Sequence, residues 1–231
     1  MAFRKTRMQV AKEAKVLSWA EIPDARFKNA KVDLKRAAQI EFEARFRLTW
    51  PWDADYERDR RGFDPAFDEY PLLVGHPETP GDIVWLLDLC RKFDPPLPVA
   101  CRSGGHNTAG YCVVTGGIVI DMGLFDDVQV YPNRLLGKVG AGVTFRKLNK
   151  ILDQYGLHIP GGECEDVCIG GYMQGGGYGL TSREFGMNCD NVIEFTMLTY
   201  DADGAHVVVA SATKLGREAE SSTIQAVGER R

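Results

Sequence analysis

The sequence predicts an α+β fold, with a small parallel unit beside antiparallel strands. An apolar segment at 71–74, an amphipathic segment at 80–93 and an apolar segment at 97–101 follow one another. Strand, helix and strand in this order favour parallel pairing. Residues 128–139 and 192–210 each hold two apolar segments around turn-forming residues, so both predict antiparallel hairpins.

The helix at 80–93 has a start signal, an apolar face and a stop signal. Thr79 is a suitable N-cap, and Pro80 fits the first helical position, where no backbone N–H is needed. The apolar face carries Ile83, Leu86, Leu87 and Cys90. Asp94-Pro95-Pro96 ends the helix because proline supplies no amide to the hydrogen-bond ladder.

Three further elements complete this prediction. A short apolar strand is expected at 117–122, and helices are expected at 37–46 and 144–155. One face of the last helix holds Leu148, Ile151, Leu152 and Tyr155, and Gly156 provides its C-terminal stop.

The patterning divides the chain into three parts. Residues 1–66 are rich in charge and carry no catalytic signal, so they are expected to form a polar N-terminal arm and lead-in. Residues 67–213 hold the predicted strands and helices and form the expected domain. Residues 214–231 are polar without an apolar face, and we expect a disordered tail that does not continue the domain.

Composition excludes several classes of function. The chain has 231 residues, a net charge of -4 and six cysteines. This charge gives no reason to expect a nucleic-acid partner, and no apolar run is long enough for a membrane span. The basic start of the chain lacks the apolar core of a secretory signal, so we expect a cytoplasmic protein with mostly reduced cysteines.

The first chemical motif is the loop Arg102-Ser103-Gly104-Gly105-His106-Asn107, which directly follows a predicted strand. Two glycines allow the backbone to approach a ligand closely, and consecutive N–H groups can point at phosphate oxygens. Arg102 could add charge-assisted hydrogen bonds. An ordinary tight turn is the alternative interpretation.

The second motif is the glycine-rich stretch 161–179, which is interleaved with Val, Ile, Met and Tyr. Such glycine density costs chain entropy and is typical of close approach to a bulky ligand. A flexible linker is the alternative, although the apolar residues oppose it. Neither loop contains the phosphate-loop or the dinucleotide-binding glycine fingerprint.

A metal site is a competing hypothesis for the same residues. Cys164 and Cys168 could form a ligand pair, with His106 or His158 as a third ligand. The chain offers no second pair of cysteines or histidines at metal-binding spacing, so the sequence favours no metal.

Taken together, the two loops resemble the vanillyl-alcohol-oxidase superfamily of flavoproteins. The segment from Val99 to Gly110 resembles its pyrophosphate loop, and the segment from Gly161 to Gly179 resembles the berberine bridge enzyme branch. The likeness runs from about Asp53 to Thr213. It implies a PCMH-type FAD-binding domain, with a small parallel unit and an antiparallel sheet packed with helices.

The resemblance implies a role for each loop in binding FAD. His106 would bond to the 8α-methyl carbon of the flavin ring, and Cys164 would bond to ring carbon 6, so that the cofactor is held bicovalently. The implied cofactor-binding residues are Arg102, Ser103, Gly104, Gly105, His106, Asn107, Gly110, Cys164, Val167, Gly170, Gly171, Tyr172, Gly175, Gly176, Gly177 and Val192.

The sequence departs from the family pattern at two positions of the second loop. Tyr172 stands where many members have histidine, and its hydroxyl could still donate near the flavin. Cys168 stands where glycine is common, and it is expected to lie close to the flavin-contacting backbone.

Family members are about twice as long in outline, which suggests that this chain is truncated. The resemblance implies an oxidoreductase in which FAD accepts a hydride from an alcohol or carbohydrate substrate and dioxygen reoxidises it. The alternative is an FAD-binding module without turnover. No catalytic base can be named from this sequence.

Overall fold

The computed structural model of the protein describes residues 34–211, 215–217 and 228–229. The chain divides into two compact units, residues 1–121 and 122–231, and each is described by itself. The predicted domain 67–213 includes parts of both units and stays a prediction. No helix within the described ranges combines the length and apolar character needed to cross a bilayer.

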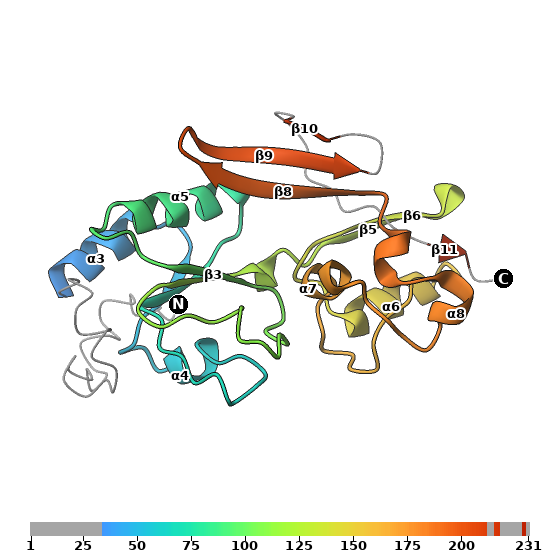
Figure 1. The fold of residues 1–231 in the computed structure, drawn as a ribbon, viewed down its shortest axis with the longest axis horizontal. Helices are drawn as coiled ribbons and strands as arrows, with labels where there is room; N and C mark the ends of the chain where they lie inside the picture. Colours follow the sequence, from blue (N-terminus) through green and yellow to red (C-terminus); the bar gives the residue numbers. More distant parts are fainter. Residues whose placement is uncertain (1–33, 212–214, 218–227, 230–231) are drawn as a thin grey trace, which may run out of the picture. The chain divides into compact units, whose positions relative to one another are not determined.

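The first unit is built on a four-stranded sheet with the order β1 (Arg47–Thr49), β2, β4 and β3. Figure 1 labels β3 of this sheet. Strands β2 (Leu73–His76), β4 (Ile118–Asp121) and β3 (Val99–Arg102) run parallel. The predicted strand–helix–strand unit is therefore present, but β4 lies between its two strands. Val74, Ala100 and Val119 form an apolar cluster, one residue from each parallel strand.

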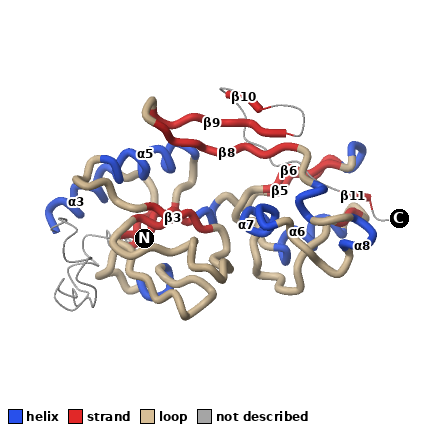
Figure 2. Tube along the Cα trace, in the orientation of Figure 1, coloured by secondary structure: helices blue, strands red, loops and turns tan. Residues whose placement is uncertain are grey.

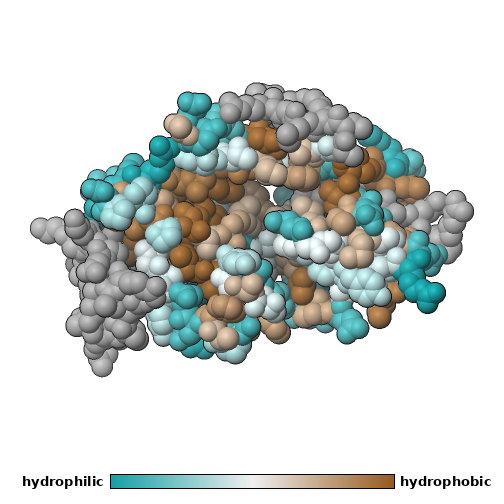
Figure 3. Space-filling model, viewed as in Figure 1, coloured by the Kyte–Doolittle hydropathy of each residue, from teal (hydrophilic) through white to brown (hydrophobic). Residues whose placement is uncertain are grey.

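Helix α5 (Pro80–Arg91) connects β2 to β3 and begins as the sequence predicts. The Thr79 hydroxyl accepts from the Asp82 amide at 3.3 Å, while the Asp82 carboxylate accepts from the Thr79 amide at 2.8 Å. Leu86 is fully buried above Gly75, where a Cβ would lie 2.6 Å from the leucine side chain. The helix keeps half-buried apolar residues such as Val84 and Leu87, and Figure 3 shows apolar surface where α5 lies in Figure 1.

The expected polar lead-in contributes regular structure to this unit. It contains helices α3 (Leu34–Glu43) and α4 (Tyr56–Asp59), and strand β1 (Arg47–Thr49) pairs antiparallel with β2. The sequence did not predict this role, because Asp59 and Arg60 are charged residues that the structure buries within the unit. Residues 1–33 of the expected arm lie outside the described residues.

A buried polar cluster joins α4 to the sheet. The Asp59 carboxylate accepts hydrogen bonds from Thr49 on β1, at 2.8 Å, and from the guanidinium of Arg47. His76, at the end of β2, lies with its Nε2 3.1 Å from the Thr49 hydroxyl and 3.4 Å from the Asp59 carboxylate. Asp59 and His76 are both buried, so their mutual contacts replace the water they lose on folding.

The second unit begins with the predicted hairpin of β5 (Val128–Tyr131) and β6 (Leu136–Val139). Helix α6 (Phe145–Asp153) follows, with Thr144 as its N-cap. Its buried residues Phe145, Leu148 and Leu152 pack with Val139, Val143, Leu157, Ile159 and Ile169. This cluster is the core against which the glycine-rich segment folds.

The rest of the second unit is a second hairpin and short elements. Strands β8 (Glu194–Asp201) and β9 (Gly204–Ser211) form the predicted hairpin, and β10 (Leu215–Arg217) extends it beside β9. Strand β11 (Gly228–Glu229) pairs with β7 (Leu157–His158). The expected disordered tail at 214–231 therefore includes two strand segments, and the remainder lies outside the described residues.

Six short helical elements complete the described part of this unit. Within the glycine-rich region these are α7 (Ile169–Tyr172) and the 3₁₀ turn η4 (Met173–Gly175), followed by α8 (Ser182–Phe185) and η5 (Asn188–Asn191). The 3₁₀ turn η2 (Met122–Leu124) precedes the first hairpin, and η3 (Pro132–Arg134) connects its two strands.

We predict that His76 makes the first unit less stable in mild acid. Burial, with the nearby positive charge of Arg47, lowers the pKa of His76 below its usual value. The unfolded chain then binds more protons than the folded chain below about pH 6.5, so stability is highest above that pH and falls as the pH decreases. Asp59 also has a lowered pKa, but carboxylates titrate at lower pH, near 4.

Urea unfolding followed by tryptophan fluorescence, between pH 5 and 8, measures this effect. All four tryptophans precede Met122, so the signal reports on the first unit. We expect His76→Gln to flatten the pH dependence between pH 5 and 7. Equal slopes in the variant and the unaltered chain would contradict the prediction.

Candidate functional site

The first candidate loop leaves β3 and runs from Ser103 to Gly117 without a helix or strand (Figure 2). Gly105 and Gly110 have φ of +75° and +76°, which glycine adopts without strain. A Cβ at Gly110 would also lie 2.4 Å from the Phe67 ring. The Asn107 side chain accepts from the amides of Ala109 and Tyr111, at 2.9 and 3.1 Å, and closes a turn.

The backbone of this loop is open to a ligand at its tip. Gly104 and Asn107 are exposed, and Ser103 and His106 are half-buried. Within the part of the chain that the structure describes, the amides of Gly104, His106 and Asn107 donate no hydrogen bond. Unpaired N–H groups at a glycine-rich turn are suited to binding an anion such as a pyrophosphate.

Arg102 contributes to this site in a different way from that expected. Its side chain is buried, and its guanidinium donates to the Asp121 carboxylate at 2.5 and 3.0 Å. It also donates to the carbonyls of Asp59, at 2.5 Å, and Arg61, at 3.1 Å. These contacts occupy the guanidinium within the protein, so the expected contact with pyrophosphate remains a prediction that the geometry does not support.

His106 lies at the tip of the loop with one face covered. Its imidazole stacks on the Phe63 ring, with ring centroids 4.7 Å apart and an interplanar angle of 19°. No hydrogen bond to the imidazole is found among the described residues. Its ring nitrogens are therefore available to a ligand, as a covalent attachment would need.

The second candidate segment lies along the start of α6. Amide-to-carbonyl bonds from Phe145 to Val167, Arg146 to Glu165, Ile169 to Val143 and Gly170 to Ala141 join 165–170 to 141–146. The Arg146 guanidinium pairs with Glu165 at 2.6 Å and Asp166 at 3.0 Å. Cys164 stands exposed at the start of this braced segment, so its sulfur is accessible.

Several glycines of this segment are required by protein packing. A Cβ at Gly170 would lie 2.6 Å from the Ala141 carbonyl oxygen, and a Cβ at Gly177 would lie 2.5 Å from Asn188. A Cβ at Gly179 would lie 2.0 Å from the Gly161 carbonyl oxygen. Gly176 and Gly177 also have positive φ, of +92° and +75°. Their presence needs no ligand.

Gly171 and Gly175 differ from these glycines. A Cβ at either position would meet no atom of the described residues within 4 Å, and neither glycine has a positive φ. Gly171 even lies inside α7, where glycine is less favourable than alanine. The fold therefore gives no reason for glycine at these two positions, whereas close approach of a ligand would.

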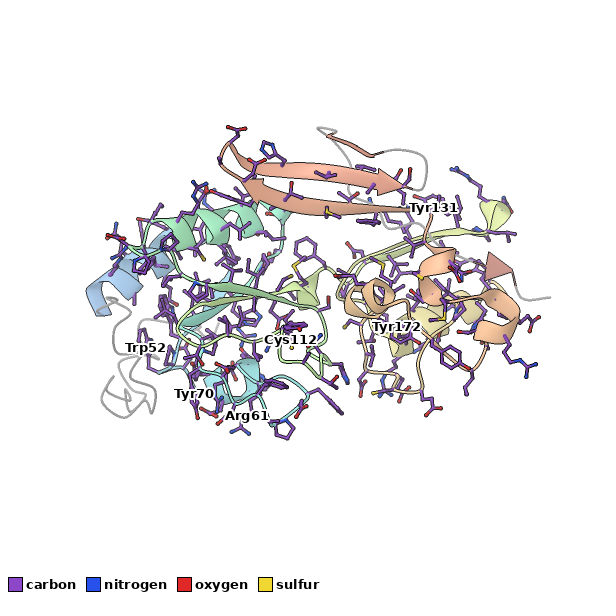
Figure 4. The ribbon with its side chains drawn as sticks, in the orientation of Figure 1. Trp52, Arg61, Tyr70, Cys112, Tyr131 and Tyr172 are labelled. Atoms are coloured by element: carbon purple, nitrogen blue, oxygen red, sulfur yellow. The ribbon has the colours of Figure 1, made fainter. Side chains whose placement is uncertain are left out.

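Tyr172 supports the segment from within (Figure 4). Its ring meets Phe145 edge to face at 4.9 Å, and its hydroxyl donates to the carbonyl of Tyr178. Burial raises the pKa of Tyr172, which keeps the hydroxyl protonated as a donor. The hydroxyl that was expected to donate near the flavin is thus engaged by the loop in this structure.

Cys168 and the two valines of the expected site belong to the protein interior. Cys168 is buried, and its sulfur donates to the Gly142 carbonyl at 3.3 Å. Val167 and Val192 are partly buried and pack against the core of the second unit. These three residues support the backbone, and a side-chain contact with a cofactor remains a prediction for them.

The metal hypothesis gains no geometric support. No group of three His, Cys, Asp or Glu residues arranged to hold a metal ion is found in the described ranges. His158 instead lies with its Nε2 2.8 Å from the Thr181 hydroxyl. All six cysteines are free thiols, and burial raises the pKa of Cys90 to about 12.

The structure groups the expected residues into two sets, one in each unit. Arg102 to Gly110 form one loop of the first unit, and Cys164 to Val192 fold together in the second. Sequence reasoning missed Phe63, which contacts His106, and Arg146, which braces the Cys164 segment. Both contacts are long-range, and no local motif marks either residue.

Comparison of this chain with known proteins identifies a family and several relatives. Residues 71–210 match the FAD binding domain family. The carbohydrate oxidase of Microdochium nivale is 32% identical over 168 residues, which cover 71% of this chain and 33% of that protein. The crystal structure of a carbohydrate oxidase from that organism, in complex with a substrate analogue, aligns with a TM-score of 0.67 and 30% identity, over 77% of this chain and 37% of that one.

Two further solved structures share the fold. BBE-like 1 of Physcomitrella patens aligns with a TM-score of 0.72 and 24% identity, over 83% of this chain and 44% of that one. The glucooligosaccharide oxidase of Acremonium strictum, which carries a 6-S-cysteinyl, 8α-N1-histidyl FAD, aligns with a TM-score of 0.70 and 19% identity, over 84% and 42%.

The chain thus spans about a third of the length of the curated oxidase that it matches. The predicted α+β class and the relationship to FAD-linked oxidoreductases are both confirmed by these matches. The chain belongs to the FAD binding domain family.

Proposed function

We propose that this chain is the flavin-holding part of an FAD-dependent oxidoreductase that oxidises an alcohol or carbohydrate substrate. The observation that carries the proposal is that each unit, taken by itself, has a glycine-rich loop with an open backbone. One offers the unpaired amides of Gly104, His106 and Asn107, and the other offers the backbone of Gly171 and Gly175. Similarity to a carbohydrate oxidase supports the substrate class.

Each open group has a defined part in this proposal. The amides of the first loop would hold the pyrophosphate, whose negative charge suits unpaired N–H donors. Gly171 and Gly175 would let the backbone lie against the flavin ring without side-chain clash. His106 and Cys164 would provide the covalent anchors, since the imidazole of His106 has no hydrogen-bond partner among the described residues and Cys164 is exposed.

Bound FAD would supply the hydride acceptor, and dioxygen would then reoxidise it. The protein's part is to orient the cofactor and to keep its anchors accessible. Arg102 would help to orient the cofactor by fixing the end of β3 through its hydrogen bonds to Asp121. In the second unit, Arg146 would help to orient the cofactor through its ion pairs with Glu165 and Asp166, which follow Cys164.

A second candidate function is FAD binding without turnover. It is favoured by length, because the chain covers 33% of the carbohydrate oxidase that it matches. Oxygen uptake with a panel of alcohols and sugars distinguishes the two candidates. Uptake by the flavin-loaded chain supports the oxidase, and bound flavin without uptake supports the binding module.

The first prediction concerns attachment, and intact mass under denaturing conditions measures it. We expect the unaltered chain to carry one covalent FAD, each of His106→Ala and Cys164→Ala to retain it through the other anchor, and the double variant to lose it. Cys189→Ala is the matched control, since Cys189 is another exposed cysteine of the second unit. A bare polypeptide mass for the unaltered chain would rule out bicovalent attachment.

The second prediction contrasts two adjacent glycines. Gly171→Ala adds a methyl group in open space, so we expect the flavin-free chain to gain about 0.5–1 kcal/mol in unfolding free energy. The same methyl group would obstruct the cofactor. In the His106→Ala/Cys164→Ala background, where FAD would bind reversibly, we expect FAD affinity to fall about tenfold or more, equivalent to about 1.4 kcal/mol.

Gly170→Ala is the comparison variant for Gly171→Ala, and we expect it to have the opposite effect on stability. There the new Cβ lies 2.6 Å from a carbonyl oxygen, so we expect a loss of about 1–3 kcal/mol in stability before any cofactor is present. Urea unfolding followed by circular dichroism and titration of flavin fluorescence measure the two quantities. Unchanged FAD binding by Gly171→Ala would show that this backbone does not approach the flavin.

A further inference from the structure

We infer that Phe63 is a positioning residue for the flavin attachment at His106. This inference rests on the proposed function, because it concerns the geometry of one of the two anchors. Phe63 lies in the segment that the sequence marks as a polar lead-in without a functional role. In the structure, Phe63 contacts the first glycine-rich loop at His106, which lies 43 residues further along the chain.

The contact is a face-to-face one. The rings of Phe63 and His106 are 4.7 Å apart at 19°, which covers one face of the imidazole. The Phe63 side chain is 64% exposed, so its burial in a core does not explain its position. Since the described residues give the imidazole no hydrogen bond, this stack is a contact that can restrict its rotation.

The backbone fixes Phe63 against the same loop. The Phe63 amide donates to the Gly105 carbonyl at 2.8 Å, directly before His106. A Cβ at Gly62 would lie 3.3 Å from that oxygen and 3.5 Å from the Cys112 sulfur, so the two segments are in close contact. The stacking partner is therefore held by the backbone that carries His106.

Two buried arginines hold the segment from both sides. Arg102 donates to the Arg61 carbonyl, two residues before Phe63, at 3.1 Å. Arg60 is 2% exposed, pairs with Glu57 and Asp68 at 2.9 and 2.6 Å, and lies 4.0 Å over the Tyr70 ring. Figure 4 places Arg61 and Tyr70 beside α4. Phe63 thus projects from a loop that the Arg60–Asp68 ion pair spans and that Arg102 binds at the Arg61 carbonyl.

Attachment makes a geometric demand that this arrangement meets. It forms one bond between a His106 nitrogen and the 8α carbon, while one proton leaves that carbon and one leaves the imidazole. The two electrons released pass to the flavin ring and then, with the two protons, to dioxygen, which gives hydrogen peroxide. An imidazole held in one plane reaches the bonding geometry more often than one that rotates freely.

The test compares attachment rates in the full chain carrying Cys164→Ala, so that His106 is the remaining anchor. Flavin-free protein is mixed with FAD in air, and covalent flavin is followed by intact mass. Phe63→Leu keeps apolar bulk without the ring, and we expect attachment about fivefold slower, within the range of aromatic pair energies. Phe63→Trp keeps a stacking ring and should restore the rate to within about twofold.

Phe42→Leu is the matched control, since Phe42 is 89% exposed on α3, and its rate should equal that of the parent chain. Equal rates for Phe63→Leu and the parent would overturn the inference. No covalent flavin in the parent would instead overturn the proposed anchor at His106, which separates the two failures.

Proton NMR of the flavin-free chain provides a readout that does not depend on the cofactor. The Phe63 ring should shift the His106 Cε1 and Cδ2 protons upfield, with the signals assigned by their loss in His106→Ala. We expect Phe63→Leu to remove the shift and Phe63→Trp to keep it. A His106 spectrum that Phe63→Leu leaves unchanged would show that the rings do not stack, and would overturn the inference whatever the attachment rates.

Discussion

The guanidinium of Arg102 connects three separate stretches of the first unit. It binds Asp121 at the end of β4 and the carbonyls of Asp59 and Arg61 beside α4, while its own backbone ends β3. A buried charge is tolerated only with such partners, and loss of one partner from a buried pair commonly costs about 3–5 kcal/mol. The backbone that leaves β3 toward His106 therefore starts from a fixed point.

The same constraint explains how a polar segment takes part in the site. Asp59 uses its carboxylate on Thr49 and Arg47, and its carbonyl on Arg102. Residues that follow Asp59 are consequently held near the end of β3. The charges that make this segment look like a solvated arm are the groups that attach it to the sheet.

Sequence patterns predicted the elements that depend on local rules. The Thr79 cap, the helix after Thr144 and both hairpins follow from capping and turn residues, and all are present. The place of β4 between β2 and β3 could not be predicted, because strand order depends on contacts between distant segments.

In the candidate site, too, local features could be predicted from the sequence and long-range contacts could not. The density of glycine pointed to both loops, because glycine is favoured where the backbone itself has a positive φ or is closely approached by another group. It could not tell Gly170, which a neighbouring carbonyl requires, from Gly171, which faces open space. The side-chain partners of Arg102, Tyr172 and His106 lie elsewhere in the sequence, so their orientation needed the structure.

The contrast between packed and open glycines also bears on how this sequence can change over time. Substitutions at Gly170 and Gly179 are opposed by the fold itself, so purifying selection would act on them in any descendant that still folds. Substitutions at Gly171 and Gly175 meet no steric obstacle in the part of the chain that the structure describes. In a lineage that had given up its ligand both glycines would be free to drift, with alanine the first replacement, while their neighbours stayed glycine. The pattern of glycine loss along this one segment would then separate descendants that still bind from those that only fold.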